Sequence, residues 1–402
     1  MGSSDSQSNP SPFVVDFSNT EIAFAHKTNG QLRRTAWLFR LMSKSWLVNV
    51  GGTFGLWLNS NGITIFNPII RATIFRQFCG GISLQDSTDT IRHLKDLHAL
   101  SVLDYGAEAK SREQDFDNTL EENIRAIRYA STNPGVPVIS SKLTALASKD
   151  LFERYQSGPL QSEEDRAAFA RVEARVDRLC RTAMENGVAV FIDAEETWIQ
   201  DAIDGIVKRM MEAYNREKVV VYHTYQLYRK DKLESLKQDF QEAQEKGYIL
   251  GAKLVRGAYM EKERERARTR NYPSPIQDTK ADTDRDYDLA VRFCIDHYEK
   301  IALCNASHNE KSNRLQAELI VAKGLPRDHR HLNFSQLLGM SDHITFNLAK
   351  GGFNVAKYLP YGPVREVLPY LIRRARENSA VRGEMGRELS LIVSEMRRRG
   401  MM

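Results

Sequence analysis

The sequence is poor in cysteine and lacks the short motifs of metal sites, nucleotide loops and serine hydrolases. Its 402 residues include four cysteines without C-x-x-C spacing: Cys79, Cys180, Cys294 and Cys304. Scattered cysteines are typical of reduced thiols in a cytosolic protein, which argues against a disulfide framework. His223 and His308 have no H-E-x-x-H or H-x-x-x-H pattern, so we predict no metal site. The absence of G-x-S-x-G, G-x-G-x-x-G and P-loop motifs argues against a serine hydrolase and a doubly wound nucleotide-binding sheet.

The chain also lacks a long apolar run and a strong excess of one charge. No segment reaches the ~20 apolar residues of a membrane span, and the uncharged segment 45–70 is interrupted by Asn, Gly and Pro68. The net charge of +5 is small for this length and gives no reason to expect nucleic acid as a partner. The arginines at 397–399 are predicted to be solvated, with contact to an anionic membrane surface as the alternative.

From about residue 99, short apolar runs alternate with amphipathic helical stretches. Eight runs are predicted as strands: Ser101–Tyr105, Val136–Ser140, Val188–Asp193, Val219–Thr224, Ile249–Val255, Ile301–Ala306, His331–Phe334 and Phe353–Tyr358. Helices are predicted between them at 116–131, 164–186, 197–214, 229–246, 284–299 and 309–323. Such an alternation predicts an α/β fold, a TIM-like (β/α)8 barrel, whose usual size is about 250 residues.

The pattern divides the chain into four segments. Residues 1–12 are polar and are expected to be a disordered tail, and residues 13–98 a helical arm or subdomain. Residues 99–380 are expected to form the barrel, and residues 381–402 a C-terminal helix and basic tail. The arm carries aromatic residues that are predicted to pack in its core, with surface docking as the alternative: Trp37, Phe39, Trp46, Phe54 and Trp57.

Polar residues follow the predicted strands, at the end of a barrel where such enzymes hold their chemistry. In strand order they are Asp104, Tyr105 and Glu108; Ser141 and Lys142; Asp193, Glu195 and Glu196; His223, Thr224, Tyr225 and Gln226; Lys253, Arg256, Gly257 and Tyr259; Ser307, His308 and Asn309; Ser335 and Gln336; Tyr358 and Tyr361. Taken singly, each is more often a capping or loop residue, and Lys142 and Asp193 are equally well explained as a structural ion pair. Taken together, their cations predict an anionic cofactor with phosphates and an anionic substrate.

The segment 357–378 carries a second signal. It reads as a strand end and turn followed by a helix with one apolar face. A polar stripe of Glu366, Tyr370, Arg373 and Glu377 runs along the same helix, with Arg374 beside it. Two adjacent arginines can converge on one carboxylate in a bidentate manner, although a solvated charged face is the alternative. Pro369 is expected to kink this helix or to mark its first turn.

Several motifs, in this order, resemble the proline dehydrogenase family. They are L-D-Y-G-A-E (103–108), S-K-L-T-A-L (141–146), I-D-A-E-E (192–196), T-Y-Q (224–226), K-L-V-R-G-A-Y (253–259), A-S-H-N (306–309), Q-L-L-G-M (336–340), Y-L-P-Y-G (358–362) and Y-L-I-R-R-A-R-E-N (370–378). The resemblance covers roughly residues 74–380 and implies a flavoenzyme that oxidises L-proline to Δ1-pyrroline-5-carboxylate. The electrons would pass through FAD to a membrane quinone, and a separate pyrroline-5-carboxylate dehydrogenase is a possible partner.

The resemblance also implies roles for individual residues. Arg373 and Arg374 would bind the proline carboxylate, and Lys142 would add positive charge. Asp193, Tyr358 and Glu377 would shape the pocket, and Glu108 would pair with Arg373 as a gate. The FAD contacts would come from His223, Gln226, Lys253, Val255, Arg256, Gly257, Ala258, Tyr259, Lys280, Thr283, Ser307, His308 and Asn309. The sequence departs from the family's best-known bacterial pattern at His223, Lys253 and Asn333.

The length leaves no room for the aldehyde dehydrogenase module of bifunctional relatives, and no signal or transit peptide is evident. We therefore expect a cytoplasmic bacterial protein, peripheral to the inner membrane where it meets quinone, or a mitochondrial protein if the source is eukaryotic. Three alternatives stay open: a barrel flavoenzyme like methylenetetrahydrofolate reductase, a hydroxyproline dehydrogenase, and a non-catalytic membrane-associated barrel. Crowding of a hydroxyl by Tyr358 favours proline over hydroxyproline.

Overall fold

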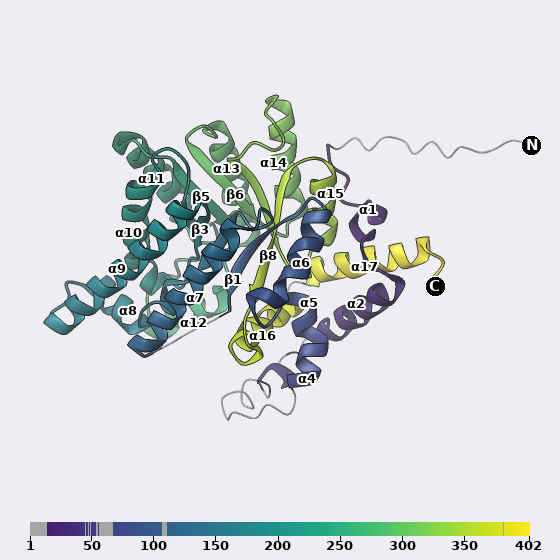
Figure 1. Cartoon of the computed structure of the whole chain (residues 1–402), viewed down its shortest axis with the longest axis horizontal. Coiled ribbons are helices and arrows are strands. Elements are labelled where there is room, and N and C mark those ends of the chain that lie inside the picture. The colour runs from purple at the N-terminus through teal and green to yellow at the C-terminus, as the bar shows by residue number, and fades with distance from the viewer. Residues whose placement is uncertain are drawn as a thin grey trace, which may run out of the picture.

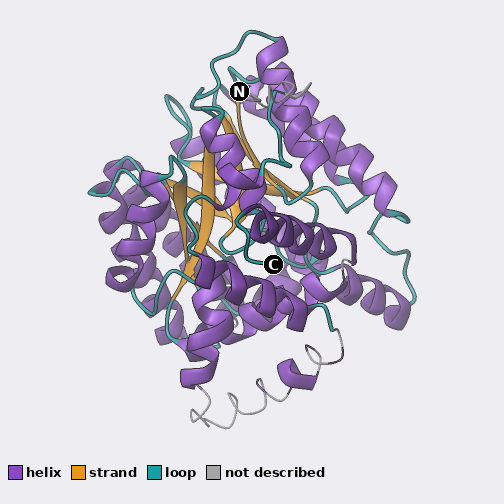
Figure 2. Ribbon diagram, turned by 90° about the vertical axis from the view of Figure 1, so that its right-hand side faces the viewer, coloured by secondary structure: helices purple, strands orange, loops and turns teal. Residues whose placement is uncertain are grey.

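A computed structural model describes residues 14–44, 46, 48, 50–53, 55, 67–106, 111–380 and 382–402, with side chains except at 67, 376–380 and 382–385. Eight parallel strands close into a barrel in sequence order, and helices surround it (Figures 1 and 2). The strands are β1 Leu100–Tyr105, β2 Val138–Ser141, β3 Ala189–Ile192, β4 Val221–Gln226, β5 Leu250–Val255, β6 Ile301–Ala306, β7 Leu332–Leu337 and β8 Asn354–Tyr361. The predicted (β/α)8 barrel is confirmed.

Every predicted strand is present, with its ends moved by one to three residues at most positions. β4, β7 and β8 extend past their predicted ends because the polar residues there continue the ladder with the neighbouring strand.

The helices are α1 Thr20–Phe24, α2 Asn29–Met42, α4 Asn67–Ile70, α5 Arg76–Phe78, α6 Leu84–Asp96, α7 Glu113–Ser131, α8 Lys149–Ser157, α9 Glu163–Asn186, α10 Thr197–Tyr214, α11 Lys232–Lys246, α12 Met260–Arg270, α13 Lys280–Asp296, α14 Glu310–Ala322, α15 Asp342–Lys350, α16 Val364–Ala380 and α17 Arg382–Arg398, with a π-helical turn η1 at Arg71–Phe75 and a 3-10 turn η2 at Leu143–Ala145.

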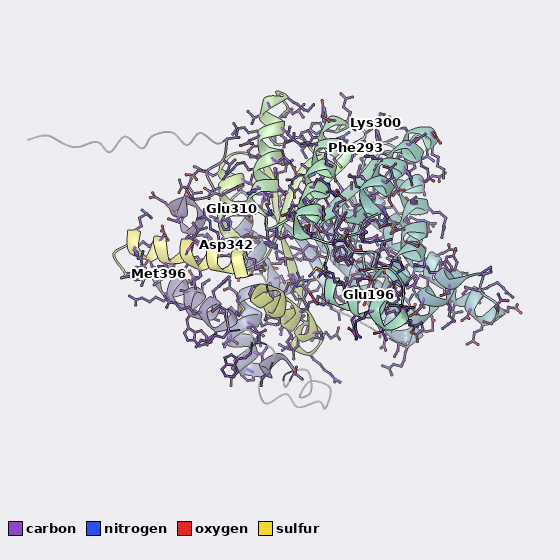
Figure 3. The ribbon with its side chains drawn as sticks, turned by 180° about the vertical axis from the view of Figure 1, so that it is seen from behind. Glu196, Phe293, Lys300, Glu310, Asp342 and Met396 are labelled. Carbon is purple, nitrogen blue, oxygen red and sulfur yellow. The ribbon has the colours of Figure 1, made fainter. Side chains whose placement is uncertain are left out.

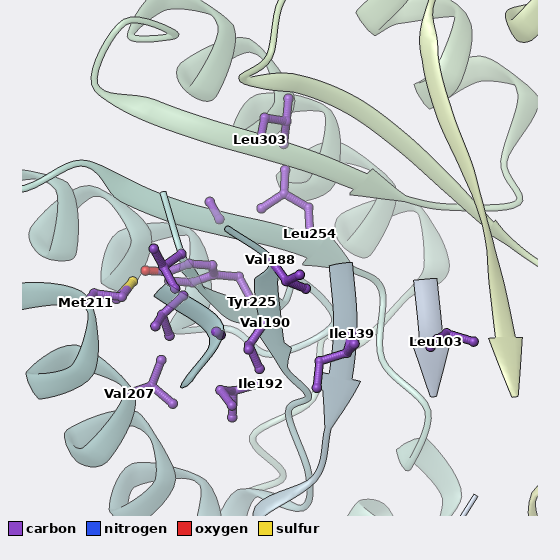
Figure 4. Close-up of a cluster of buried hydrophobic side chains, with 14 of the residues drawn as sticks. Leu103, Ile139, Val188, Val190, Ile192, Val207, Met211, Tyr225, Leu254 and Leu303 are labelled. Atoms are coloured by element: carbon purple, nitrogen blue, oxygen red, sulfur yellow. The ribbon is translucent and has the colours of Figure 1, made fainter. Parts of the chain in front are cut away.

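The main core lies between the strands and the surrounding helices. Alternate strand residues, such as Leu103, Val190 and Leu254, point outward and pack there with Val207 and Met211 of α10 (Figure 4). The residues between them point into the barrel, because successive side chains of a strand face opposite sides. The interior therefore receives every second residue of each strand, and its upper layer is the polar set that ends the strands.

The N-terminal helices form a second hydrophobic cluster with the C-terminal helices. Phe24 of α1, Phe39 of α2 and Phe78 of α5 are buried there with Leu371 of α16 and Ile392 of α17. Figure 1 shows α2 and α17 lying side by side, although they are at opposite ends of the chain. The two ends of the chain thus share one cluster beside the barrel.

The aromatic residues of the arm divide into two groups. Phe39 is fully buried, as predicted. Trp37 and Trp46 are 52% and 65% exposed, so core packing is wrong for both, because each lies on the solvent side of the arm. Phe54 and Trp57 lie outside the described residues. For Trp37 and Trp46, the alternative of surface docking stays a prediction.

The basic C-terminal end is not simply solvated. Arg399 donates hydrogen bonds to the carbonyl oxygens of Lys27 (2.7 Å) and Phe24 (2.8 Å) and pairs with Glu395 at 2.7 Å. Arg398 pairs with Glu395 at 2.8 Å and with Glu21 at 3.3 Å. These arginines tie the last helix to α1, and this corrects the expectation of a solvated tail.

Three other sequence predictions can be compared with the fold. All four cysteines are buried and unpaired, and burial raises the pKa of each thiol. Within the described residues, no helix combines the length and apolar character needed to cross a membrane. Pro369 lies inside α16, five residues after its first residue, so it does not mark the first turn.

Gly339 joins the arm to the barrel and generates a stability prediction. Its φ is +77°, and a β-carbon there would lie 2.0 Å from the backbone oxygen of Gln77. Gly352 has a nearly equal φ of +79° with nothing within 4 Å of such a carbon. Both Gly→Ala changes should cost roughly 1–2 kcal/mol for the left-handed backbone, and Gly339→Ala should lose roughly 1–3 kcal/mol more from overpacking. Urea unfolding measures the free energy of unfolding of both variants. Equal losses of stability would contradict the close contact between Gly339 and Gln77.

Candidate active site

The barrel holds a cavity of about 340 Å³ at the C-terminal ends of its strands. Its wall is contributed by the strand ends, by the loops after them and by α16. The lining residues are Asp104, Lys142, Asp193, Ala194, Thr224, Gln226, Lys253, Val255, Arg256, Gly257, Ala258, Tyr259, Ala306, Ser307, His308, Asn309, Ser335, Gln336, Leu337, Met340, Tyr358, Tyr370, Arg373 and Arg374. Five cations face two carboxylates in this wall, so the cavity is suited to an anionic ligand.

Asp193 is the centre of the polar contacts at the bottom of the cavity. Its Oδ1 accepts hydrogen bonds from Lys253 Nζ at 2.6 Å and from Ser140 Oγ at 3.0 Å. Its Oδ2 accepts from the Tyr358 hydroxyl at 2.7 Å and lies 3.5 Å from Lys142 Nζ. Burial alone would raise the pKa of Asp193, but Lys253 and Lys142 outweigh burial and hold that pKa below its ordinary value. The expected clustering of Lys142, Asp193 and Tyr358 at one mouth is present.

Lys253 has an environment that keeps its ammonium group oriented. The group lies 5.1 Å from the ring centre of Phe191 and 4.8 Å from that of Tyr358. Lys253 is 5% exposed, so the ion pair with Asp193 is shielded from water and weakly screened. The buried pair gives the cavity floor a fixed geometry.

Arg373 and Arg374 of α16 also line the cavity. Both guanidinium groups lie near the ring of Tyr370, at 5.9 Å and 5.4 Å from its centre. Arg373 also lies 6.0 Å from the ring centre of Tyr259, which follows β5. The two arginines therefore line one cavity instead of spreading over a solvated face. Both arginines line the cavity, and their convergence on one carboxylate stays a prediction.

A second part of the wall comes from the ends of β4, β5 and β6. Arg256 is fixed by Asp284 at 2.8 Å, by the Ser307 hydroxyl at 2.8 Å and by the Ser312 hydroxyl at 3.0 Å. The half-buried His308 has its Nδ1 2.8 Å from the Ser341 hydroxyl. Burial, with Lys357 and Arg374 nearby, lowers the pKa of His308 to about 3, so its imidazole is neutral at pH 7.

Most of the predicted cofactor residues line this cavity, but three do not. His223 points outward from β4, with its Nε2 2.8 Å from Asp204 and its Nδ1 3.6 Å from Asp239, so the predicted FAD contact is wrong for this side chain. Thr283 is buried in the first turn of α13, where its hydroxyl bonds to the Thr279 carbonyl. Lys280 is exposed on the same turn and pairs with Asp284 at 2.6 Å. Asp284 also pairs with Arg256, so Lys280 is linked to the cavity wall through this shared carboxylate.

Two predicted site residues have no described side chain, and two further residues near the cavity were not among the predictions. Glu108 lies outside the described residues, and Glu377 is placed only as part of the α16 backbone. Asn333 lies low in the barrel, where its amide bonds to the Arg330 carbonyl at 3.0 Å. Sequence reasoning missed Ser140, one residue before the polar end of β2, and Met340, which belongs to the Q-L-L-G-M motif. The alternation of β2 could have identified Ser140 as inward-facing.

The buried pairs of Asp193 generate a prediction about pH. A carboxylate with a lowered folded-state pKa stabilises the protein above its unfolded pKa of about 3.9, and the stabilisation is lost as pH falls. Asp193→Asn should therefore lower the free energy of unfolding by about 3–5 kcal/mol near pH 7, and the difference from wild type should shrink as pH falls below about 4.

Denaturant unfolding across pH measures this difference. The control is Asp296→Asn, which breaks an exposed pair with Lys323 (2.9 Å) and should change stability little at any pH. A loss for Asp193→Asn that stays constant down to about pH 2 would contradict a paired, ionised Asp193.

Comparisons with known proteins bear on the family and on the fold of this chain. A family model described as proline dehydrogenase matches residues 87–387. The chain is 36% identical over 323 residues to the carbapenem antibiotics biosynthesis protein CarD of Pectobacterium carotovorum subsp. carotovorum, covering 80% of this chain and 83% of that protein. It is 40% identical over 266 residues to mitochondrial proline dehydrogenase 1 of Homo sapiens, covering 64% of this chain and 44% of that protein.

A solved structure shares the fold. Proline utilization A (PutA) from Bdellovibrio bacteriovorus, inactivated by N-propargylglycine, superposes with a TM-score of 0.69 at 20% identity, over 90% of this chain and 36% of that chain. At this identity the likeness bears on the fold alone. The family model, in contrast, spans most of the sequence and includes nearly every residue of the cavity. On that evidence, this chain belongs to the proline dehydrogenase family.

Proposed function

We propose that this protein oxidises L-proline to Δ1-pyrroline-5-carboxylate with a bound FAD, as the first step of proline breakdown. The observation that carries the proposal is the pair of arginines, Arg373 and Arg374, that lines the strand-end cavity from α16. A planar guanidinium fork matches a carboxylate, and two forks from adjacent residues can hold one carboxylate in a fixed orientation. Proline presents such a carboxylate next to its reacting carbon.

The residues of the cavity fit a flavin. Gln226 is 2% exposed, and its Oε1 makes no hydrogen bond with any residue that the structure describes. A buried acceptor of this kind calls for a donor, and a ring N–H of a flavin would supply one. At Gly257 a β-carbon would meet the ring of Tyr228 at 2.5 Å, so the cavity wall there is bare backbone. Arg256 is suited to hold the phosphate groups.

The chain's own residues would position the substrate. Bound FAD supplies a two-electron acceptor for the hydrogen that leaves the carbon beside the proline nitrogen. Arg373 and Arg374 would bind the carboxylate, and Lys142 would add positive charge near them. Tyr358, held by Asp193, would pack beside the ring. Because proline must react with a neutral amine, these groups have to orient the substrate without keeping its nitrogen protonated.

The proposal extends to the later fate of the electrons and the product. We propose a membrane quinone as the electron acceptor, with the protein bound peripherally to the membrane. Exposed Trp37 and Trp46 on the N-terminal arm support such docking, because large apolar side chains on a surface favour contact with a membrane or a partner. A separate pyrroline-5-carboxylate dehydrogenase would then consume the product.

The three alternatives are less well supported by the site. A barrel reductase for a folate would not need two arginines converging in the cavity from α16. A non-catalytic barrel would not need a buried ion cluster of Asp193, Lys253 and Lys142 at its floor, because such clusters are costly to bury. Hydroxyproline differs by one hydroxyl group, and the buried Tyr358 in the cavity wall favours the smaller substrate.

A spectroscopic experiment tests the function. The purified protein should be yellow, and anaerobic addition of L-proline should bleach its visible absorbance. A soluble quinone analogue should then restore the colour faster than oxygen or a nicotinamide does. A folded protein without flavin would contradict the cofactor, and a yellow protein that proline does not bleach would contradict the substrate. Rapid reoxidation by oxygen alone would contradict the quinone.

The arginine pair generates a second prediction. Arg373→Met or Arg374→Met should lower kcat/KM for proline by at least about tenfold, because each charge-assisted hydrogen bond contributes about 1.5–3 kcal/mol. Most of the loss should appear as a higher KM with normal flavin content. Lys should be a poor replacement at either position, because it cannot reproduce the planar fork.

The matched control is Arg365→Met, which removes an exposed arginine from the same helix. Steady-state kinetics of the three variants compare the effects directly. If Arg365→Met lowers kcat/KM as much as the other two changes, α16 acts only through its overall charge and the carboxylate clamp is wrong.

A further inference from the structure

A second cavity lies outside the barrel, between the N-terminal arm and the outer face of β8. Its volume is about 250 Å³, and its wall brings together Lys27, Arg34, Arg76 and Lys357. These cations come from four separate segments: the connection between α1 and α2, then α2, α5 and β8. Since like charges repel, four cations that converge from separate segments require a compensating anion or a ligand.

The protein supplies one carboxylate in this wall, Asp342. Its Oδ1 lies 2.9 Å from Lys357 Nζ, and its Oδ2 lies 3.0 Å from Lys27 Nζ. Figure 3 labels Asp342 beside α17, where the neighbouring Ser341 amide donates a hydrogen bond to Glu388. Glu388 of α17 also acts on Lys357, but burial raises the pKa of Glu388 to about 7, so its charge is only partial near neutral pH. Asp342 therefore serves both lysines, and the two arginines remain uncompensated in the cavity wall.

The two arginines are free to bind a ligand. Arg76 is exposed and makes no hydrogen bond or ion pair with any residue that the structure describes. Arg34 donates one hydrogen bond, to the carbonyl oxygen of Ala72, which carries no charge. His26 adds no charge, because burial lowers its pKa to about 3. The cavity thus has three more cations than carboxylates in its wall.

The sequence around the cavity has the same bias. Between Glu21 and Asp86 there is no acidic residue, while the basic residues there are Lys27, Arg33, Arg34, Arg40, Lys44, Arg71 and Arg76. A one-signed stretch of this length creates a positive field over the arm and attracts anions toward the cavity. Arginine in particular favours phosphate, because its fork binds two oxygens at once.

We propose that this cavity, named here the arm cavity, binds a phosphate monoester. The ligand is either a soluble phosphate ester or the headgroup of an anionic lipid, and the chemistry of recognition is the same. Trp37 lies one helical turn from Arg34 and is exposed, which favours the lipid source. The cavity is separate from the one at the strand ends, because Lys357 and Tyr358 point to opposite faces of β8.

The first experiment measures thermal unfolding of the full-length protein with inorganic phosphate and with sn-glycerol 3-phosphate. A ligand that binds only the folded state raises Tm in a saturable way, and sodium chloride at equal ionic strength should not reproduce the rise. Arg34→Gln and Arg76→Gln should each weaken binding by at least about tenfold, since each removes a charge-assisted fork.

The matched control is Arg33→Gln, which removes an exposed arginine one residue away on α2 that does not line the cavity. It should change the affinity by no more than about twofold, as expected for a screened surface charge. Proline oxidation without phosphate should be unchanged in the Arg76→Gln variant, which distinguishes a lost site from a misfolded protein.

The second experiment separates the two sources. Cosedimentation with phosphatidylcholine vesicles, with or without phosphatidic acid, tests the lipid headgroup. Vesicle binding that needs phosphatidic acid and Arg76 identifies a lipid ligand, and a Tm rise without such vesicle binding identifies a soluble ester. The proposal is overturned if neither probe binds, or if Arg33→Gln weakens binding as much as Arg76→Gln.

Discussion

One carboxylate, Asp193, holds the polar centre of the barrel together. It joins β3 to β5 through Lys253, to β8 through Tyr358, and to β2 through Ser140 and Lys142. A barrel interior filled by apolar residues would be more stable, because buried charges lose their hydration. The cluster is therefore better understood as a rigid cavity floor whose geometry is fixed by four strands at once. Under the proposed function, a substrate held by its carboxylate would need such a rigid surface beneath its ring.

Because successive side chains of a strand face opposite sides, each barrel strand can supply polar residues both to the cavity and to the surrounding helices. On β8, Tyr358 faces the interior and the active-site cavity, whereas Lys357 faces outward, bonding to Asp342 and to the Met340 carbonyl at 2.5 Å. On β4, Gln226 faces inward, whereas His223 faces the helices and is held by Asp204 and Asp239. Each strand thus carries one polar set for the cavity and another for anchoring the outer elements. The outward-facing set includes buried charged groups, and their ion pairs hold particular helices against particular strands.

Because polar residues occur on both faces of the strands, the sequence predicts the strands better than it predicts which polar side chains face the cavity. The eight strands and the clustering of Lys142, Asp193 and Tyr358 follow from apolar periodicity and from polar residues at strand ends. His223 was assigned to the wrong side, because Tyr222 to Gln226 are all aromatic or polar and no apolar residue marks the outward face of that stretch. Trp37 was assigned to the core because an aromatic residue in a helix usually packs inward. The second cavity was not predicted, since its four cations lie as far apart as Lys27 and Lys357 in the sequence.

The loop between β7 and α15 shows why the chain ends belong with the barrel. Met340 of this loop lines the active-site cavity, and the loop is held from three directions. Gln77 of the arm donates to the Gly339 carbonyl at 2.8 Å, the Ser341 amide donates to Glu388 of α17 at 2.7 Å, and Lys357 donates to the Met340 carbonyl. Ser341 in turn contacts His308 of the cavity wall. The arm and the last helix therefore fix one wall of the site, and a barrel without them would leave that wall without two of its three supports.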